Sequence, residues 1–79
     1  MMYLEIITPE KLLFAGEITL IKLPGASGSF EIMKNHAPII SVLTQGKIKV
    51  REPNDVVSYF EVKGGLVEFS NNEVKVLAE

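Results

Sequence analysis

The chain has 79 residues, of which 47% are hydrophobic and 23% are charged, with a formal net charge of −2 at pH 7. This length allows one domain, and the apolar content excludes a disordered chain. The absence of cysteine excludes disulfides, cysteine-based zinc sites and thiol catalysis, and a single histidine leaves few side chains for enzyme chemistry. The acidic balance argues against nucleic acid as the main partner. We therefore expect a small binding or structural module without a catalytic site.

Glycine and proline recur at short intervals and leave no room for a long helix. The segments between them are rich in Val, Ile, Leu, Thr and Phe, which suit a pleated surface. Residues 3–6 alternate as a first strand, and residues 11–14 follow Pro9 as a short second strand. Residues 17–23 are apolar in both phases, which predicts one strand covered on both sides or carrying a bulge. The pattern predicts an all-β fold: a single flattened sandwich or barrel of about ten short strands over residues 1–79.

Residues 23–30 are mostly small and lie between apolar segments. They predict a loop at one end of the sandwich. The two glycines of this loop could expose backbone N–H groups to an anion, but the segment lacks the Gly-Lys-Ser/Thr ending of a phosphate loop and does not open a helix. Contact with another protein is the better functional interpretation, because exposed loops on rigid scaffolds carry recognition.

The next segment holds the candidates for chemistry. His36 has no second histidine, no cysteine and no carboxylate at a metal-ligand spacing, so a structural or interface role is predicted, with no metal and no cofactor. Met33-Lys34 stands mid-chain, where biotinyl and lipoyl carrier domains of similar size present a modified lysine. Here Asn35 replaces the second methionine of that motif. A carrier domain modified at Lys34 remains one alternative.

Residues 47–51 alternate three cations with two aliphatic side chains. They predict a strand that pairs with residues 56–63 in a register that the pattern leaves open. Three cations on one strand are more typical of a solvated sheet face than of a polyanion site.

The last two segments predict a hairpin, since residues 66–70 and 73–77 flank Asn71-Asn72. Asparagine tolerates positive φ, which a two-residue hairpin turn requires. This register places Phe69 opposite Val74 on one face and sets Glu68 opposite Lys75 on the other.

Several short motifs follow one another along the chain in a recognisable order and spacing. They are Thr8-Pro9-Glu10, Phe14-Ala15-Gly16, Leu23-Pro24-Gly25, Gly28-Ser29-Phe30, His36-Ala37-Pro38, Gly46, Gly64-Gly65 and the ending Val74-Lys75-Val76-Leu77-Ala78-Glu79. Together they resemble the N-terminal β-sandwich domain of the epsilon subunit of F-type ATP synthases, over residues 1–79.

Two departures from this family stand out. The Pro-Gly that usually precedes His-Ala-Pro is Lys34-Asn35 here, and Asn can replace Gly at a positive φ. The helical hairpin that commonly follows the sandwich is not found in these residues. Its inhibition of ATP hydrolysis and its ATP binding are therefore not carried over, and no nucleotide binding is expected.

The resemblance implies a non-catalytic central-stalk subunit that rotates with the gamma subunit and the c-ring and couples proton-driven rotation to ATP synthesis. It implies a peripheral place at the cytoplasmic face of the bacterial plasma membrane, as part of the synthase. A free-standing β-sandwich adaptor with an unrelated partner is the other alternative.

The resemblance also assigns contact residues. Contact with the c-ring would fall on Pro24, Gly25, Ala26, Ser27, Gly28, Ser29, Phe30 and Glu31. Contact with gamma would fall on Thr8, Met33, His36, Ala37 and Pro38, with Thr8 close to the His36 segment. Relatives often carry acids in the c-ring loop; Ser27 and Ser29 stand in two such places, which leaves Glu31 as the main charge.

Overall fold

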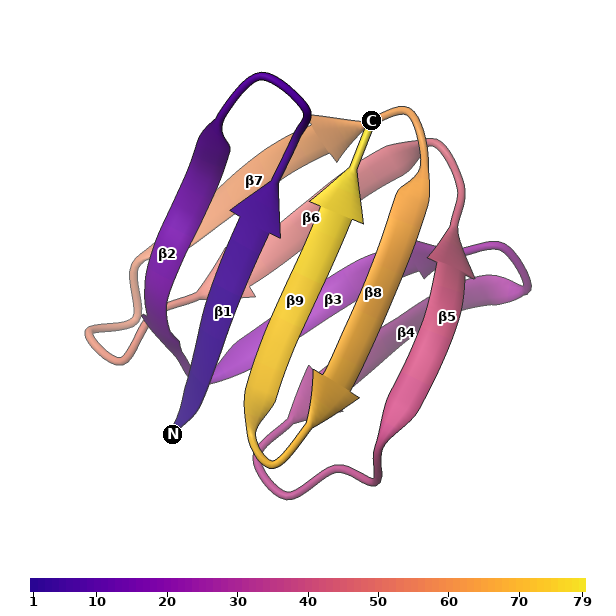
Figure 1. Ribbon diagram of the computed structural model, residues 1–79. Coiled ribbons are helices and arrows are strands. Elements are labelled where there is room, and N and C mark those ends of the chain that lie inside the picture. Colours follow the sequence, from indigo (N-terminus) through magenta and orange to yellow (C-terminus); the bar gives the residue numbers. More distant parts are fainter.

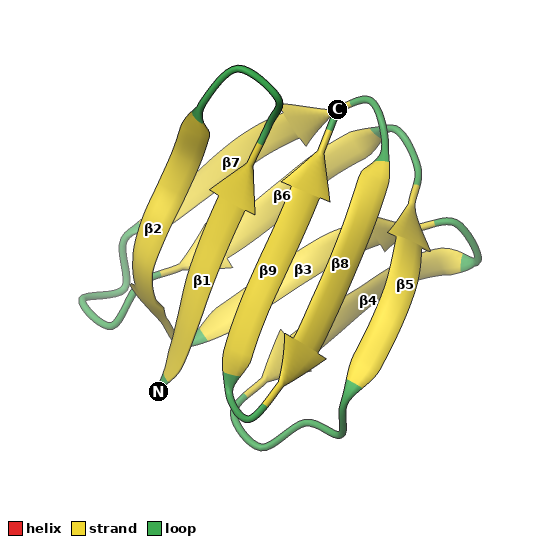
Figure 2. Cartoon of the chain, in the orientation of Figure 1, coloured by secondary structure: helices red, strands yellow, loops and turns green.

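The computed structural model describes residues 1–79, and its regular structure consists of β-strands (Figure 2). The strands are β1 (Met2–Ile7), β2 (Leu12–Ile18), β3 (Leu20–Gly25), β4 (Gly28–Met33), β5 (Ile39–Leu43), β6 (Gly46–Arg51), β7 (Val57–Val62), β8 (Gly65–Ser70) and β9 (Glu73–Ala78). The predicted all-β class is confirmed, with nine strands where about ten were expected. Strand β2 runs on well beyond the short segment expected there.

The strands form two layers that face each other (Figure 1). Their order is β2-β1-β9-β8-β5-β3-β6-β7, and β4 pairs with β3. One residue pair, Gly25 with Leu43, joins β3 to β5, so the sheet folds over at this point. We call β2, β1, β9, β8 and β5 the front sheet, and β4, β3, β6 and β7 the back sheet.

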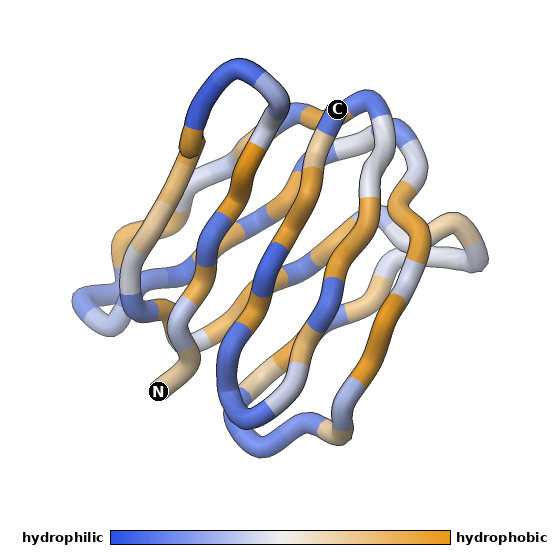
Figure 3. Tube along the Cα trace, in the orientation of Figure 1, coloured by the Kyte–Doolittle hydropathy of each residue, from blue (hydrophilic) through white to orange (hydrophobic).

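The core lies between the two sheets and consists of alternate side chains from both. Hydropathy alternates along the front strands in the same way (Figure 3). Leu4 and Ile6 of β1 are fully buried, whereas Tyr3, on the opposite face of the same strand, is exposed. No polar or charged side chain is buried, so apolar packing is what holds the layers together. The core cluster comprises Met2, Leu4, Ile6, Ile18, Ile21, Leu23, Ile32, Leu43, Ile48, Val50, Val62, Val67, Phe69, Val74, Val76 and Ala78.

The expectation of one continuous strand over residues 17–23 is wrong. Ile18 ends β2 in the front sheet, and Leu20 begins β3 in the back sheet, opposite Arg51. Thr19 lies at the corner, where its backbone N–H and its hydroxyl both donate to the carbonyl of Arg51, at 2.8 and 3.3 Å. The chain changes sheets here, and this is why Ile18 from one phase and Ile21 and Leu23 from the other reach the same core.

The final hairpin has the predicted register. Phe69 lies opposite Val74, and Glu68 lies opposite Lys75. Asn71 and Asn72 have φ values of 51° and 59°, as a primed two-residue turn requires. The pairing of β6 with β7, predicted without a register, runs from Gly46 opposite Val62 to Arg51 opposite Val57.

The two ends of the chain contribute neighbouring strands to the middle of the front sheet. Strand β1 pairs with β9 in parallel, from Tyr3 beside Glu73 to Ile7 beside Leu77. Parallel neighbours start at the same end, so the N-terminus and the C-terminus lie at opposite ends of this sheet (Figure 1).

Candidate functional site

The residues predicted to face the c-ring form one hairpin, not the loop that was expected over residues 23–30. Backbone pairing of β3 with β4 continues to Gly25 opposite Gly28, and the turn consists of Ala26 and Ser27 alone. The tip of this β3–β4 hairpin projects at the right of Figure 1. Small residues here permit a tight strand pair as well as a loop, and the pattern could not separate the two.

Close packing holds the hairpin tip in place. A Cβ atom on Gly25 would lie 2.6 Å from the carbonyl oxygen of Gly28 and 2.8 Å from the Phe30 ring. Gly28 has a φ of 127°, which side chains rarely adopt. The N–H of Ala26 donates to the carbonyl of Val42 at 2.9 Å and ties the hairpin to β5. The tip is therefore a rigid projection of the sandwich.

The predicted c-ring residues differ in exposure. Residues 26–29 are exposed at the tip, Pro24 and Phe30 are half-buried, and Gly25 is buried beneath them. Phe30 also packs against the core. The exposed tip thus offers hydroxyls and backbone groups, while Gly25 and Phe30 support it from below.

Glu31 was expected to be the main charge of this contact, but it does not lie at the tip. It stands within β4 opposite Lys22, whose other neighbour, on β6, is Lys49. The carboxylate therefore belongs to the outer face of the back sheet, among cations. The tip itself carries no charged side chain.

Four of the five residues predicted to face gamma lie together, at and after the end of β4. Met33 ends that strand, and residues 34–38, the β4–β5 loop, are all exposed. The N–H of His36 donates to the carbonyl of Met33 at 3.1 Å. Its ring meets the ring of Phe69 edge-on, with centroids 6.0 Å apart and planes at 80°, and its Nδ1–H donates to the carbonyl of Ala37 at 2.7 Å. His36 thus anchors an exposed loop to the core.

Asn35 takes the positive φ of 67° that was expected of a residue in place of glycine. Its backbone N–H donates to Oδ1 of Asn72 at 2.8 Å, and Nδ2 of Asn72 donates to Oδ1 of Asn35 at 3.3 Å. The sequence pattern placed each asparagine in a turn, but it carried no sign that the two turns meet.

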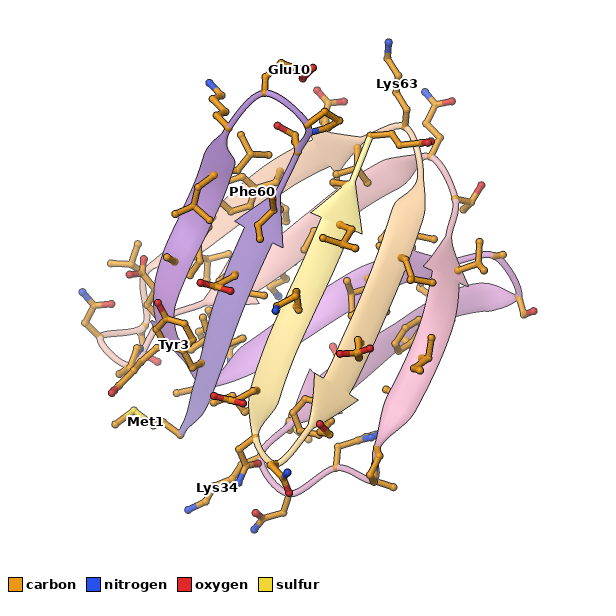
Figure 4. All side chains as sticks on the ribbon, viewed as in Figure 1. Met1, Tyr3, Glu10, Lys34, Phe60 and Lys63 are labelled. Carbon is orange, nitrogen blue, oxygen red and sulfur yellow. The ribbon has the colours of Figure 1, made fainter.

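Thr8 does not lie close to the His36 segment, so that expectation is wrong. Thr8 follows β1 at the far end of the front sheet, whereas the start of β1 lies beside Asn72, whose carbonyl accepts the N–H of Tyr3 at 3.0 Å. Figure 4 shows the separation: Glu10, in the same loop as Thr8, and Lys34 are at opposite ends of the molecule.

An apolar row on the outer face of the front sheet was missed. Its members lie opposite one another on successive strands and run across the whole sheet: Leu12, Ile7, Leu77, Leu66 and Val42. Leu12 is 53% exposed and Val42 is 59% exposed, at the two ends of the row. Alternation in the last hairpin did place Leu66 and Leu77 on one face. Their neighbours become visible only with the strand order.

The apolar row borders an open hollow at one end of the sandwich. Four of its five members line this hollow, which measures about 740 Å³, and Thr8 and Pro9 line it too. A smaller hollow of about 410 Å³ lies where Pro38 and Ile40 meet Ser70. Thr8 and the β4–β5 loop therefore border the same outer face at its two ends.

The two outer faces of the sandwich differ in charge. The register places four carboxylates and one amine on the front face, a net charge of −3: Glu5, Glu17, Glu68 and Glu73, with Lys75. It places four cations and two carboxylates on the back face, a net charge of +2: Lys22, Lys47, Lys49 and Arg51, with Glu31 and Glu61. Such a difference in net charge between two faces orients a protein between partners of different charge.

No cluster of three or more histidine, aspartate or glutamate side chains is placed to hold a metal ion. None of the structure's elements is a helix with the length and apolar character needed to span a bilayer. What the geometry offers is two exposed projections and one apolar face, all suited to protein contacts.

Comparison with known proteins identifies the family. The family model described as the β-sandwich domain of the ATP synthase delta/epsilon chain matches residues 1–79. The ATP synthase epsilon chain of Chlorobium limicola is 41% identical over 76 residues, which cover 96% of this chain and 86% of that one. The epsilon chain of Caulobacter vibrioides is 32% identical over 78 residues, with coverage of 99% and 90%.

The fold also matches a solved structure. A chain of the mitochondrial ATP synthase of Euglena gracilis superposes with a TM-score of 0.91 at 14% identity, and the match covers 98% of this chain. This chain spans about half of that chain, 49%. At this identity the likeness shows the fold alone. The family match confirms the resemblance seen in the sequence motifs and does not favour a carrier domain or an unrelated adaptor: this chain belongs to the β-sandwich family of the ATP synthase delta/epsilon chain.

Proposed function

We propose that this chain is a non-catalytic central-stalk subunit of a proton-translocating F-type ATP synthase. It joins the gamma subunit to the c-ring and rotates with both. The observation that carries this proposal is the family match over residues 1–79, together with 41% identity to a curated epsilon chain. The structure adds exposed surfaces suited to protein contacts on a rigid domain. A subunit that couples the motion of two partners needs both features.

The tip of the β3–β4 hairpin is proposed to rest on the polar loops of the c-ring. Residues 26–29 are exposed there, and the bonds from the hairpin to β5 hold them in one position. A contact held in position before binding loses little conformational entropy when it forms. Because the tip carries no charged side chain, we expect hydroxyl and backbone hydrogen bonds to make this contact.

The gamma subunit is proposed to cover the outer face of the front sheet. This arrangement brings Thr8 and Pro38 into one interface although they lie at opposite ends of the sheet, because each borders that face. It also buries the apolar row, and exposed apolar patches of this kind commonly mark interfaces. The acidic character of the face favours a basic surface on gamma.

The two proposed contacts can be made at the same time. The β3–β4 hairpin tip precedes β4 and the β4–β5 loop follows it, and this strand has six residues. At about 3.3 Å per residue the contacts are separated by roughly 20 Å. A sandwich whose core is closely packed transmits force between these points without internal rearrangement.

As part of an ATP synthase, the chain is a component of a membrane-associated complex. We propose that its place is peripheral, at the cytoplasmic face of the bacterial plasma membrane, and that residues 1–79 act there as one domain. The curated relatives described above come from bacteria, which supports this assignment.

Co-purification tests the proposed function. The tagged chain is expressed with the gamma and c subunits of the same genome, and the complex is extracted from membranes in mild detergent. We expect gamma and the c-ring to elute together with the tagged chain. Elution of the chain without either partner would overturn the proposal. A mass increase at Lys34 on co-expression with a biotin or lipoate ligase would instead support a carrier domain.

A further inference from the structure

The β4–β5 loop carries most of the proposed gamma contacts, yet little packing holds it. All of residues 34–38 are exposed, so the hydrophobic core restrains the loop only through its ends and the His36 ring. A loop that becomes ordered only on binding loses affinity through its conformational entropy. What orders this loop in the free protein therefore matters for binding.

A pair of asparagines fastens the loop to the β8–β9 turn. Asn35 and Asn72 are 37 positions apart, and the N–H of Asn35 donates to Oδ1 of Asn72 at 2.8 Å. The amide group of Asn72 returns a second bond at 3.3 Å to Oδ1 of Asn35. The carbonyl of Asn72 also accepts the N–H of Tyr3, so the turn that holds the loop is itself fastened to β1.

We propose that this Asn35–Asn72 clasp is a positioning device that orders the β4–β5 loop before gamma binds. The inference rests on the proposed function, which assigns the loop to gamma. The apparent affinity of a site falls in proportion to the fraction of molecules that hold the binding conformation. By pinning Asn35, the clasp also fixes the turn that aims His36 at Phe69 and leaves Ala37 and Pro38 outward.

A turn-forming role alone does not account for this arrangement. Both asparagines have positive φ, which glycine supplies more easily. Glycine at residue 35 would keep the N–H that donates to Asn72 but would lose the oxygen that accepts the returning bond. Asn71 is the natural comparison, because its φ of 51° gives it the same kind of position in the same turn, and its side chain makes no hydrogen bond to the loop.

Four variants separate positioning from folding. Asn72→Gly keeps the turn and removes both clasp bonds, whereas Asn35→Gly acts from the loop side and removes only the weaker one. Asn72→Asp keeps the acceptor for the N–H of Asn35 and serves as the conservative rescue. Asn71→Gly is the matched control. Each is titrated calorimetrically with isolated gamma, and the ring and backbone resonances of His36 are followed by NMR.

For Asn72→Gly we expect gamma binding to weaken about 5- to 10-fold, the usual net effect of about one hydrogen bond. The His36 ring should lose the ring-current shift that Phe69 imposes, and its backbone should become more mobile. Asn72→Asp should restore most of the gamma affinity and most of the order of the His36 segment that Asn72→Gly loses. The gamma affinity of Asn35→Gly should lie between that of wild type and that of Asn72→Gly. The affinity of Asn71→Gly should stay within about 2-fold of wild type, since this variant loses no bond to the loop.

The possible failures are distinct. Folded Asn72→Gly that binds gamma like wild type, or whose His36 resonances do not change, would overturn the clasp while the proposed function stands. Should Asn72→Gly fail to fold, hydrogen exchange at the N–H of Asn35 in the wild-type chain decides the question, because exchange as fast as at an exposed amide without a partner would also overturn the clasp. A wild-type chain that does not bind gamma at all would overturn the proposed function and this inference with it.

Discussion

Gly65 begins β8 directly against the backbone of β9. A Cβ atom at this position would collide with the carbonyl oxygen of Leu77 and approach Cα of Ala78 to 3.1 Å. Its φ of 145° adds backbone strain for any other residue. Gly28 has a similar φ of 127° but faces open space. The two positions separate the effect of collision from that of strain.

Gly65→Ala is expected to lower the free energy of unfolding by roughly 3–5 kcal/mol, because overpacking against β9 adds to backbone strain. Gly28→Ala should lower it by roughly 1–3 kcal/mol, since only the strain applies there. Urea denaturation followed by circular dichroism measures both. Equal losses in the two variants would contradict the role given to the Leu77 carbonyl.

Ala37 is the residue at which the gamma assignment is most directly tested. It is exposed, so Ala37→Glu should change stability by no more than about 0.5 kcal/mol. A charge placed in a desolvated interface should weaken gamma binding by about 2 kcal/mol or more. Val56→Glu, in the exposed β6–β7 loop, adds the same charge outside the proposed interface and serves as control. Calorimetric titration that finds both variants at wild-type affinity would remove Ala37 from the interface.

At the scale of elements, the β3–β4 hairpin acts as a stiff projection because pairing continues to its last residues. Gly25 and Gly28 allow the strands to approach closely, and the bonds to β5 brace them from the side. Loops that carry function are commonly more mobile than this. The exposed side chains of Ala26, Ser27 and Ser29 can be exchanged with little effect on the fold, whereas Gly28 is constrained by its positive φ.

The double substitution Ser27→Glu with Ser29→Glu tests whether charge strengthens the c-ring contact. Both serines are exposed, so stability should change by about 0.5 kcal/mol or less for each. We expect several-fold tighter binding to purified c-ring in low salt. The gain should vanish near 1 M salt, where the Debye length falls to about 3 Å.

The control for this experiment is the matched pair Ser27→Gln with Ser29→Gln, which adds similar bulk without charge. Binding should then stay near the wild-type value at all salt concentrations. A gain that survives high salt, or that the glutamine pair reproduces, would show that bulk and not charge is responsible.

At the scale of the whole molecule, the sandwich has two outer faces of different chemistry. The front face combines the apolar row with net negative charge, and the back face is net positive, with Met33, Val57 and Tyr59 as its exposed large apolar residues. A symmetric sandwich would offer gamma two equivalent surfaces. This one offers a single apolar face that extends from Thr8 to Pro38.

Leu77→Gln and Tyr59→Gln compare the two faces. Leu77 is 48% exposed on the front face and Tyr59 is 61% exposed on the back face, so neither change should unfold the protein. Loss of an apolar side chain from a buried contact costs roughly 1.5 kcal/mol or more. Gamma affinity should therefore fall about 10-fold for Leu77→Gln and stay unchanged for Tyr59→Gln. The reverse order in a titration would place gamma on the back sheet.

Local patterns in the sequence accounted for part of this structure. Alternation with a period of two residues predicted the inward and outward faces of the strands, and Asn71-Asn72 predicted the last turn and its register. These features depend on neighbours in the chain, so the chain itself reveals them. The same reasoning failed at Thr19, because a change of sheet and a strand covered on both faces produce the same apolar run.

By itself, the sequence determined the all-β class, the final hairpin and the family, since each follows from composition, periodicity or the order of short motifs. Only the tertiary structure decided that Thr8 and His36 lie at opposite ends of the front sheet, that Asn35 meets Asn72, and that an apolar row crosses the front face. The physical reason is the distance along the chain over which each kind of interaction acts. Turn and strand preferences act between residues close in the chain, whereas strand order is set by how both sheets together bury one shared core, and many orders satisfy the same local pattern.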